Sequence, residues 1–411
     1  MHTTPEWLDR IRALPLPGRV RLMNVCGGHE RSISLAGLRS ILPRQIELIP
    51  GPGCPVCVCP EQDIYQAIQM ALHEDLVLVT FGDMLRVPVN VPKQAIRSLE
   101  QAKAAGADVR PIASPLEAVN IARAEPHHTL VFFAAGFETT CAPVAGMIAE
   151  GIPDNLLLLM SGRLTWPAVA MLLESEQPGF DALIAPGHVS TVMGPEEWQF
   201  VVDRHHIPAA IAGFTPESLL AATYSVLRQL IEQRPFLDNC YPEAVKPGGN
   251  PIARKLLAAT LDVVDAPWRG IGIIPASGFE LKPAYTAHNA RARFPTYADA
   301  ARRHAGEMPP GCDCARVILG KITPLQCRIY GMPCTPRTPV GPCMVSDEGA
   351  CRIWWAAGVR KSRDAQRSCR AGRRSLSQAV IGERGPGAPY RHHRPGTGCR
   401  FSGLVRGHKR L

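Results

Sequence analysis

The sequence predicts an α/β protein with two Rossmann-like parallel-sheet domains and a third, irregular α+β domain that is rich in cysteine. Three observations support this fold class. Short apolar runs alternate with amphipathic segments in the first two hundred residues, glycine and polar residues follow several of these runs, and six cysteines lie between residues 312 and 351. Strands that alternate with helices are typical of parallel sheets with both faces covered.

The predicted elements follow from the length and period of the apolar runs. We expect strands at Ile46–Pro50, Leu76–Phe81, Val109–Ala113, Leu130–Ala135, Leu156–Met160, Ala182–Ala185 and Ala209–Ala212. We expect amphipathic helices at Glu61–Leu72, Lys93–Ala105 and Trp166–Glu174. The strands are apolar almost throughout, which favours burial on both faces of each sheet.

Four of these runs end in glycine followed by polar residues. The residues with functional side chains in these loops are Asp83, Glu138 and His188, and a fourth loop is Gly213-Phe214-Thr215. Ligands of open α/β sheets bind at the carboxyl ends of the strands. The loops are therefore candidates for a shared cleft, although turn glycines with solvated neighbours would give the same pattern.

The expected domain boundaries follow from changes in composition. Residues 1–120 form the first α/β domain, with the alternative that the first 45 residues pack on the C-terminal domain. Residues 121–223 form the second α/β domain. Proline and glycine become frequent after Tyr224, so residues 224–357 form the irregular domain, with loops at 268–272 and 275–278 around a short strand. Residues 358–411 form a basic tail that we expect to be disordered.

The charge and composition exclude several classes of protein. The net charge of +9 arises from residues 360–411, which carry +12, whereas the remaining chain carries −3. A nucleic-acid role for the body of the protein is therefore not expected. No apolar run reaches the roughly 20 residues that span a bilayer, and the N-terminus lacks a signal-peptide pattern. We expect a cytoplasmic protein without a membrane partner.

The N-terminal half contains a candidate thiol site. Cys26 and His29 lie in the motif CGGHE, and Cys54 and Cys57 lie in the motif GPGCPVC. Two thiols at this spacing can form a disulfide or bind one metal ion, and the imidazole adds a nitrogen ligand or an acid/base group. Such a set is suited to zinc, to Fe(II) or to thiol–disulfide exchange. No role is assigned to the neighbouring Cys59.

The C-terminal cysteines form a second candidate site. Cys312, Cys327, Cys334 and Cys351 are separated by 14, 6 and 16 residues, and Cys314 and Cys343 lie among them without an assigned role. Long, uneven loops favour an iron–sulfur cluster, since clusters accept thiolates from distant turns. Structural zinc is the alternative, although zinc ligands more often come as closely spaced pairs.

The motifs CGGHE, GPGCPVC, FGDMLRVP, GFETT, PGHVST, WRG and CTP…GPCMVSDEGAC occur in an order that resembles the HypD family of hydrogenase maturation factors. The resemblance runs from about Leu22 to Trp355. It implies a three-domain α/β protein with a 4Fe–4S cluster, which helps to build the active-site iron of nickel–iron hydrogenases. The partners that it implies are a small HypC-type chaperone, a HypE-type cyanide donor and, indirectly, the hydrogenase large subunit.

The resemblance also implies roles for individual residues. Cys26, His29, Cys54 and Cys57 would handle an iron that carries two cyanides and one carbon monoxide, and the four widely spaced cysteines would hold the 4Fe–4S cluster. Asp83 and Glu348 would be polar members of the cleft, whereas Glu138 and His188 would either contact the ligand or take a capping or strand-end role. The chain departs from the family pattern at Arg31, where some relatives have histidine, at Cys59 and in the basic tail.

Three functions are therefore weighed. The first is a scaffold for hydrogenase maturation, in which the cluster supplies electrons to redox-active thiols. The second is an iron–sulfur protein-disulfide reductase with Cys54 and Cys57 as the exchange pair. The third is a zinc-stapled protein that binds nucleic acid through its tail. The tail itself resembles a frame-shifted translation of GC-rich DNA, with a polybasic arm as the alternative.

Overall fold

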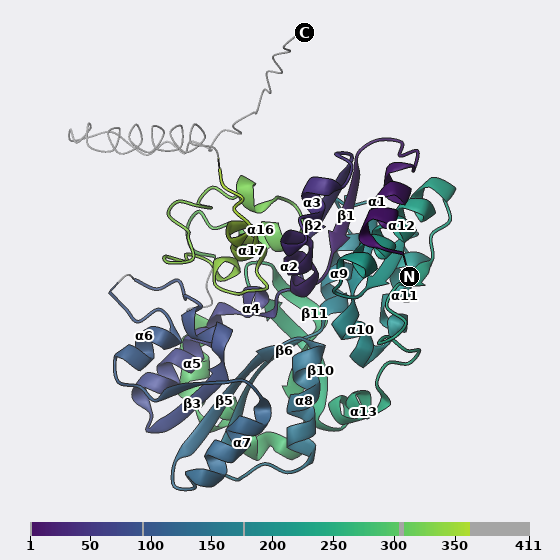
Figure 1. Cartoon of the computed structure of the whole chain (residues 1–411). Helices are drawn as coiled ribbons and strands as arrows, with labels where there is room; N and C mark the ends of the chain where they lie inside the picture. Colours follow the sequence, from purple (N-terminus) through teal and green to yellow (C-terminus); the bar gives the residue numbers. More distant parts are fainter. Residues whose placement is uncertain (1, 93, 176, 304–307, 362–411) are drawn as a thin grey trace, which may run out of the picture. The chain divides into compact units, whose positions relative to one another are not determined.

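Two sheets organise the chain, and each is built around parallel strands, which confirms the predicted fold class (Figure 1). The computed structural model describes residues 2–92, 94–175, 177–303 and 308–361. Residues 362–411 lie outside the described residues, so the predictions of disorder, a frame shift or nucleic-acid binding for this segment remain predictions. In the part of the chain that is described, no helix is both long enough and apolar enough to cross a membrane.

The first sheet has five parallel strands in the order β2-β1-β7-β8-β9. Their bounds are β1 Val20–Asn24, β2 Ile46–Pro50, β7 Ala182–Pro186, β8 Ala209–Ala212 and β9 Leu237–Asn239. Apolar side chains pack on both faces, for example Leu22 on one face and Met23 on the other. Burial on both faces explains why these strands are apolar throughout.

The second sheet has six strands in the order β10-β11-β6-β5-β3-β4. Their bounds are β3 Leu76–Phe81, β4 Val109–Ile112, β5 Thr129–Gly136, β6 Leu156–Arg163, β10 Leu261–Trp268 and β11 Gly272–Leu281. The four strands β3 to β6 are parallel, whereas β11 runs antiparallel to β6 and pairs with β10 as a hairpin. The hairpin extends the sheet at one edge.

Helices connect and cover the strands. Within the described residues the α-helices are α1 Thr4–Arg12, α2 Gly27–Leu35, α3 Leu38–Ile41, α4 Pro55–Val58, α5 Glu61–His73, α6 Leu99–Ala104, α7 Pro115–Ala124, α8 Glu138–Ala149, α9 Thr165–Leu173, α10 Gly187–Met193, α11 Gln199–Asp203, α12 Pro216–Glu232, α13 Pro251–Thr260, α14 Ala290–Arg293, α15 Pro295–Arg303, α16 Cys314–Ile318 and α17 Ala350–Ala356. The 3-10 turns are η1 Gly82–Arg86, η2 Pro195–Trp198, η3 Pro283–His288, η4 Pro324–Gln326 and η5 Pro342–Met344.

The strand pairing does not follow the expected boundaries at residues 120 and 223. Strands β1 and β2 pair in the sheet of β7 to β9, whereas β3 and β4 pair in the other sheet. Helix α12 runs through residue 223 without a break. Composition marks changes along the chain, but the choice of neighbouring strand depends on packing between segments that are far apart in sequence.

Two local expectations differ from the structure. The predicted loop at 268–272 is the turn that joins β10 to β11, whereas the predicted loop at 275–278 lies inside β11, in a hairpin that carries a bulge between Val264 and Ala266. This hairpin is half exposed, so it lacks a continuous apolar run. The predicted helix from Lys93 begins only at Leu99, because the Ser98 side chain caps it by accepting from the Gln101 N–H.

The C-terminal cysteine-bearing segment, residues 308–361, is mostly turns with the short helices α16 and α17. In Figure 1 it lies beside α2 and α4, and contacts of α17 with α2 and of α16 with α4 support this placement. Trp354 on α17 donates to the carboxylate of Glu30 on α2 at 2.6 Å, and Arg39 donates to the same carboxylate at 2.6 Å. The first 45 residues therefore do contact the C-terminal segment.

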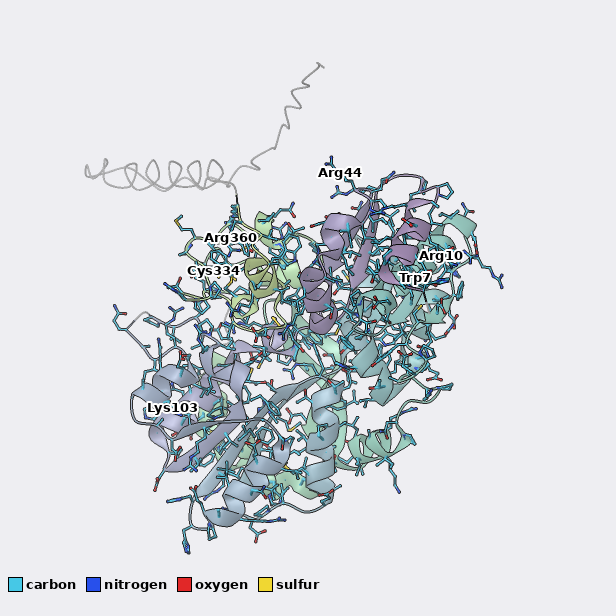
Figure 2. All side chains as sticks on the ribbon, in the orientation of Figure 1. Trp7, Arg10, Arg44, Lys103, Cys334 and Arg360 are labelled. Atoms are coloured by element: carbon cyan, nitrogen blue, oxygen red, sulfur yellow. A yellow bond between two sulfur atoms is a disulfide. The ribbon has the colours of Figure 1, made fainter. Side chains whose placement is uncertain are left out.

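Residues 358–361 complete this segment. The Tyr330 hydroxyl donates to the Val359 carbonyl at 2.8 Å, Lys361 donates to the Cys327 carbonyl at 2.6 Å, and Arg360 lies over the Trp355 ring. Arg360 and Cys334 are labelled on the same segment in Figure 2. The compact unit therefore extends to Lys361.

Truncation after Lys361 is expected to leave the folded unit intact, because the contacts of Val359 and Lys361 remain. Truncation after Ala357 removes those contacts and is expected to lower the melting temperature by several degrees, since about 1 kcal/mol is typical of each lost hydrogen bond. Thermal unfolding of the two truncated proteins beside the full chain measures the difference. Equal melting temperatures for the two truncations would contradict the role given to residues 358–361.

Candidate functional site

Cys26 lies where three loops meet. It follows β1 and occupies the N-cap position of α2. A Cβ added to Gly53 would collide with the Cys26 backbone, and one added to Gly27 would collide with Glu348. The Gly27 N–H also donates to the Gly53 carbonyl at 3.0 Å. The glycines of CGGHE and GPGCPVC therefore allow the Cys26 loop, the Cys54 loop and the Glu348 loop to approach one another.

The Cys26 thiol is held in its protonated form. The pKa of Cys26 is raised to about 12, chiefly by burial and also by the nearby Glu348 carboxylate, whereas the backbone N–H groups of His29 and Gly28 act in the opposite direction. A neutral thiol is a weak ligand, because the thiolate is the species that binds metals. A metal that binds here must therefore displace the proton.

His29 presents one free ring nitrogen. The side chain is fully buried, and burial lowers its pKa to about 4, so the imidazole is neutral. Its Nε2 lies 3.0 Å from the Ala212 carbonyl oxygen, which requires a proton on Nε2. Nδ1 then carries a lone pair, and it has no hydrogen-bond partner among the described residues. Histidines that bind metals commonly donate the other ring N–H to a carbonyl in this way.

Phe214 lies between two histidines. Its ring centroid is 4.9 Å from that of His29 and 3.8 Å from that of His188, with which it stacks. His188 lies just after β7, and Phe214 lies just after β8. Because these two strands are parallel neighbours, the loops that follow them lie at the same edge of the sheet. The sequence placed His188 in the cleft, whereas it assigned no role to the Phe214 ring.

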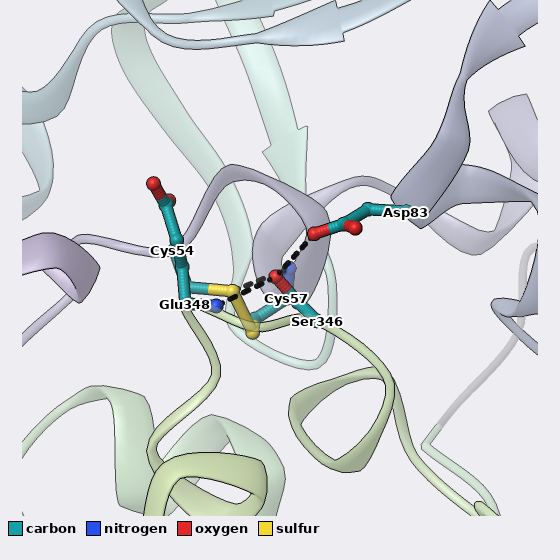
Figure 3. The surroundings of a disulfide bond; sticks show 5 residues. All are labelled: Cys54, Cys57, Asp83, Ser346 and Glu348. Atoms are coloured by element: carbon teal, nitrogen blue, oxygen red, sulfur yellow. Dashed lines mark hydrogen bonds between the residues drawn. A yellow bond between two sulfur atoms is a disulfide. The ribbon is translucent and has the colours of Figure 1, made fainter. Parts of the chain in front are cut away.

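Cys54 and Cys57 form a disulfide (Figure 3). Cys54 caps the short helix α4, with its sulfur accepting from the Cys57 N–H at 3.2 Å. Both residues are buried, and Cys57 is fully inaccessible. The disulfide is the oxidised form of the pair that the sequence identified as either a disulfide or a metal chelate.

Asp83 and Glu348 come together through a third residue. Ser346 donates to the Asp83 carboxylate at 3.1 Å and accepts from the Glu348 backbone N–H at 3.1 Å (Figure 3). The pKa of Glu348 is raised to about 7, first by loss of solvation next to the packed loops and then by the Asp83 charge, although the side chain keeps access to solvent. Sequence reasoning did not single out Ser346, although it lies in the quoted motif GPCMVSDEGAC.

One small cavity joins these groups. Its lining includes Cys26, Cys54, Cys343 and Glu348, together with Asn24. The Asn24 side-chain oxygen has no partner within the described part of the chain. Cys26 and Cys54 of the N-terminal half therefore face the same small cavity as Cys343 and Glu348 of the C-terminal segment.

The C-terminal cysteines gather in one group. Cys314 exchanges hydrogen bonds with Cys312, Cys343 and Cys351, and the Cys312 and Cys314 sulfurs lie 3.3 Å apart. Cys334 accepts from the Val340 N–H at 3.4 Å. The hydrogen bonds from Cys314 and then Cys351 hold the pKa of Cys343 well below its usual range.

This donor set fits an iron–sulfur cluster by its chemistry, since it offers six sulfurs from turns of irregular chain. The sulfurs pack against one another, and in the described residues no three His, Cys, Asp or Glu side chains surround a single metal position. Cys314 and Cys343 are the members of the group that the sequence left without a role. Both interact with Cys351, and Cys343 also lines the cavity with Cys54. These contacts form only when the turns are folded, so spacing along the chain does not predict them.

Glu138 lies away from these groups. Its carboxylate accepts from the Thr165 N–H at 2.6 Å and from the Thr165 hydroxyl at 2.7 Å, which caps the first turn of α9. This is the capping role that the strand-end pattern also allowed. The structure brings Glu138 into contact with none of Cys26, His29 or Glu348 among the interactions described.

Glu138→Gln is expected to flatten the pH dependence of stability. Burial raises the pKa of Glu138 from 4.5 to about 7, so the folded state holds the proton more tightly than the unfolded state. Stability from this group is therefore greatest below pH 4.5 and falls as the pH rises to about 7. The loss is on the order of 3 kcal/mol. Thermal unfolding of both proteins from pH 5 to 8 tests this, and parallel curves would contradict it.

Comparison with known proteins identifies the family of this chain. The family model HypD, described as "Hydrogenase formation hypA family", matches residues 3–358. The chain is 39% identical over 346 residues to hydrogenase maturation factor HypD of Rhodobacter capsulatus, covering 82% of this chain and 89% of the relative. It is 39% identical over 361 residues to HypD of Rhizobium leguminosarum bv. viciae, covering 85% and 91%.

A third relative is hydrogenase maturation factor HypD of Escherichia coli (strain K12), which is 38% identical over 343 residues, covering 82% of this chain and 88% of the relative. The family model spans both sheets and the cysteine-bearing segment. The chain therefore belongs to the HypD family of hydrogenase maturation factors.

Proposed function

We propose that this protein is the scaffold on which the iron of nickel–iron hydrogenase receives two cyanides and one carbon monoxide, in the cytoplasm. A HypC-type chaperone shares the iron, a HypE-type protein delivers cyanide, and the hydrogenase large subunit receives the product indirectly. One observation carries the proposal. Cys26 and Cys54 line one cavity, and His29, whose Nδ1 has no hydrogen-bond partner among the described residues, lies three residues from Cys26.

Different residues at the site bind the iron, which is the substrate of the scaffold, and accept the proton that is released. Cys26 offers the sulfur ligand, and neutral His29 offers Nδ1 while its other nitrogen is fixed on the Ala212 carbonyl. Glu348 lies beside Cys26, and its pKa of about 7 suits it to accept the thiol proton when iron binds. Asp83 and Ser346 hold the Glu348 loop in place.

The Cys54–Cys57 disulfide controls loading of the iron. In the oxidised form neither sulfur is a thiolate, so reduction must come first. This reduction consumes two electrons and two protons and yields two thiols. A 4Fe–4S cluster on Cys312, Cys327, Cys334 and Cys351 would, when bound, pass these electrons on one at a time from a low-potential external reductant. Cys343 contacts Cys314 and Cys351 and lines the cavity with Cys54, so it lies between the two sulfur sites.

Infrared spectroscopy tests the scaffold directly. The protein is purified without oxygen together with its small chaperone partner from a maturation-competent host. We expect absorption bands of iron-bound cyanide and carbon monoxide, and we expect the Cys26→Ala variant to lack them. A brown, folded protein without these bands, in the presence of both partners, would overturn the proposal.

The protein-disulfide reductase is the competing function. An exchange pair must meet the disulfide of its substrate, and exposed sulfur is a condition for that attack. Here Cys57 is 0% exposed and Cys54 is 5% exposed. The burial of the pair, with Cys26 lining the same cavity as Cys54, supports the scaffold over the reductase.

A further inference from the structure

Three neighbouring aromatic rings pass from an exposed to a fully buried position. His188 is exposed, Phe214 is partly buried, and His29 is 0% exposed. The His188 and Phe214 rings stack with their centroids 3.8 Å apart, and the centroids of Phe214 and His29 are 4.9 Å apart. Phe214 is therefore the ring that lies between the buried imidazole and the exposed one.

The Phe214 ring also lies close to the Cys26 sulfur. A Cβ added to Gly28 would lie 2.8 Å from Cε1 of Phe214 and 3.5 Å from Sγ of Cys26. Ring and sulfur thus reach the same point beside Gly28, and these two atoms are no farther apart than the sum of the two distances. Glycine at this position leaves room for the ring. Cys26 and His29, the residues proposed to hold iron, therefore share one apolar neighbour.

The backbone on both sides of Phe214 is fixed. The Gly213 N–H donates to the Ser218 hydroxyl at 2.7 Å, and the Thr215 side chain caps α12 by accepting from the Ser218 N–H at 3.2 Å. The Tyr241 ring packs edge-on with its centroid 6.3 Å from that of Phe214, and a Cβ on Gly213 would collide with Tyr241. Edge-on and stacked pairs are the favoured arrangements of aromatic rings. The fold therefore holds the Phe214 ring against His29.

A fixed apolar ring at this place affects which molecules reach the iron. Ring carbons accept no hydrogen bond from water, so water held between the ring and His29 would lose hydrogen bonds that it makes in bulk solvent. Carbon monoxide needs no such partner. The hydrophobic shell around a metal site controls the access of solvent. Nδ1 of His29 has no hydrogen-bond partner among the described residues, which fits a position without water.

We propose that Phe214 shields the iron position from water, so that iron held by Cys26 and His29 takes cyanide and carbon monoxide rather than water as its further ligands. This inference rests on the proposed function for the identity of the ligands. Phe214 is a specificity-determining residue that binds no iron and takes part in no bond change. His188, which stacks on the ring, holds it against His29.

The shield is tested first without iron. Diethyl pyrocarbonate modifies an imidazole whose nitrogen lone pair is accessible, and peptide mass spectrometry gives the rate for each histidine of the full-length protein. We expect His29 to react about tenfold faster in Phe214→Ala than in the parent, because the cavity left by the ring is polar at His29 and large enough for water. The exposed His127 is the internal reference.

Two substitutions of similar size distinguish an apolar shield from mere bulk. The His29 rate should stay within about threefold of the parent in Phe214→Leu and rise about tenfold in Phe214→Asn, because only leucine keeps the apolar cover. This comparison still decides the question if Phe214→Ala does not fold. Phe200→Ala is the matched control. Phe200 is partly buried and packs on Trp166 and His205, with centroids 5.9 and 6.2 Å away, so its loss should leave the His29 rate unchanged.

The second measurement concerns the ligands of iron. Phe214→Ala is purified without oxygen together with the small chaperone partner, as for the parent. The infrared bands of cyanide and carbon monoxide, per protein, should fall about tenfold, as is typical when the surroundings of a metal ligand are changed. Phe214→Leu and Phe200→Ala should keep these bands within about twofold of the parent, since both keep the apolar cover.

The outcomes separate this inference from the proposed function. Equal His29 rates in the parent, Phe214→Ala and Phe214→Asn overturn the shield. Undiminished cyanide and carbonyl bands in Phe214→Ala protein whose His29 is accessible also overturn it, because exclusion of water would then not determine the ligands. A parent protein without these bands overturns the proposed function, whereas the rate of His29 modification is measured without iron and decides the shield separately.

Discussion

Cys26→Ala is expected to abolish hydrogenase maturation while the protein keeps its cluster spectrum. The thiol lies in the cavity with Cys54 and Glu348, whereas the hydrogen bonds of the C-terminal cysteine group do not involve Cys26. Removing the thiol therefore removes one ligand of the incoming iron without changing the cluster ligands. Hydrogenase activity in a host that carries only the variant measures maturation, and the visible spectrum of the purified variant measures the cluster.

Cys240→Ala is the control for this experiment. Cys240 is a partly buried free cysteine at the end of β9 and does not line the cavity. Its replacement should leave both maturation and the spectrum unchanged. If Cys26→Ala bleaches the cluster, the division into two sulfur sites is wrong.

Cys327→Ala and Cys334→Ala are each expected to lose the brown colour. The parent protein should hold about four irons, and each variant should hold close to none, because a cluster needs its full set of thiolates. The turns of residues 308–361 should also lose stability, since metal–thiolate bonds hold irregular chain together. Iron analysis, the visible spectrum and the melting temperature provide the three measurements.

Replacement of cysteines that are not expected ligands provides the controls for this prediction. Cys314→Ala and Cys343→Ala should keep the iron, because the expected ligands are Cys312, Cys327, Cys334 and Cys351. Cys141→Ala, a buried thiol near Gly136, should keep both iron and stability within about 1 kcal/mol of the parent. A folded, brown Cys327→Ala/Cys334→Ala double variant would refute the cluster assignment.

The positions of the strands could be predicted from the sequence because they depend on local pattern. Strands β2, β3 and β8 have the predicted bounds, since each is an apolar run buried on both faces. The hairpin of β10 and β11 was missed for the converse reason. Its strands are half exposed and contain proline and glycine, so their stability comes from pairing with each other and with β6.

The candidate site likewise contains parts that local sequence predicted and parts that it could not predict. Motif chemistry indicated Cys26, His29, Cys54 and Cys57 as one group; in the structure Cys54 is bonded to Cys57 and shares a cavity with Cys26, whereas His29 does not line that cavity. Glu138 shows the limit of the strand-end rule. A carboxylate in such a loop can face a cleft or cap the next helix, and only the folded backbone around Thr165 distinguishes the two.

The sequence by itself determined the elements, the two cysteine groups and the resemblance to the family, because spacing and residue type are properties of the chain. Only the tertiary structure decided which strands share a sheet, which nitrogen of His29 is free and that Ser346 links Asp83 to Glu348. The same holds for the buried Arg269, which donates to the Glu61 carboxylate and the Pro88 carbonyl and whose Nε and Nη1 have no hydrogen-bond partner among the described residues. The reason is physical, since burial and hydrogen-bond partners arise from segments that meet after folding.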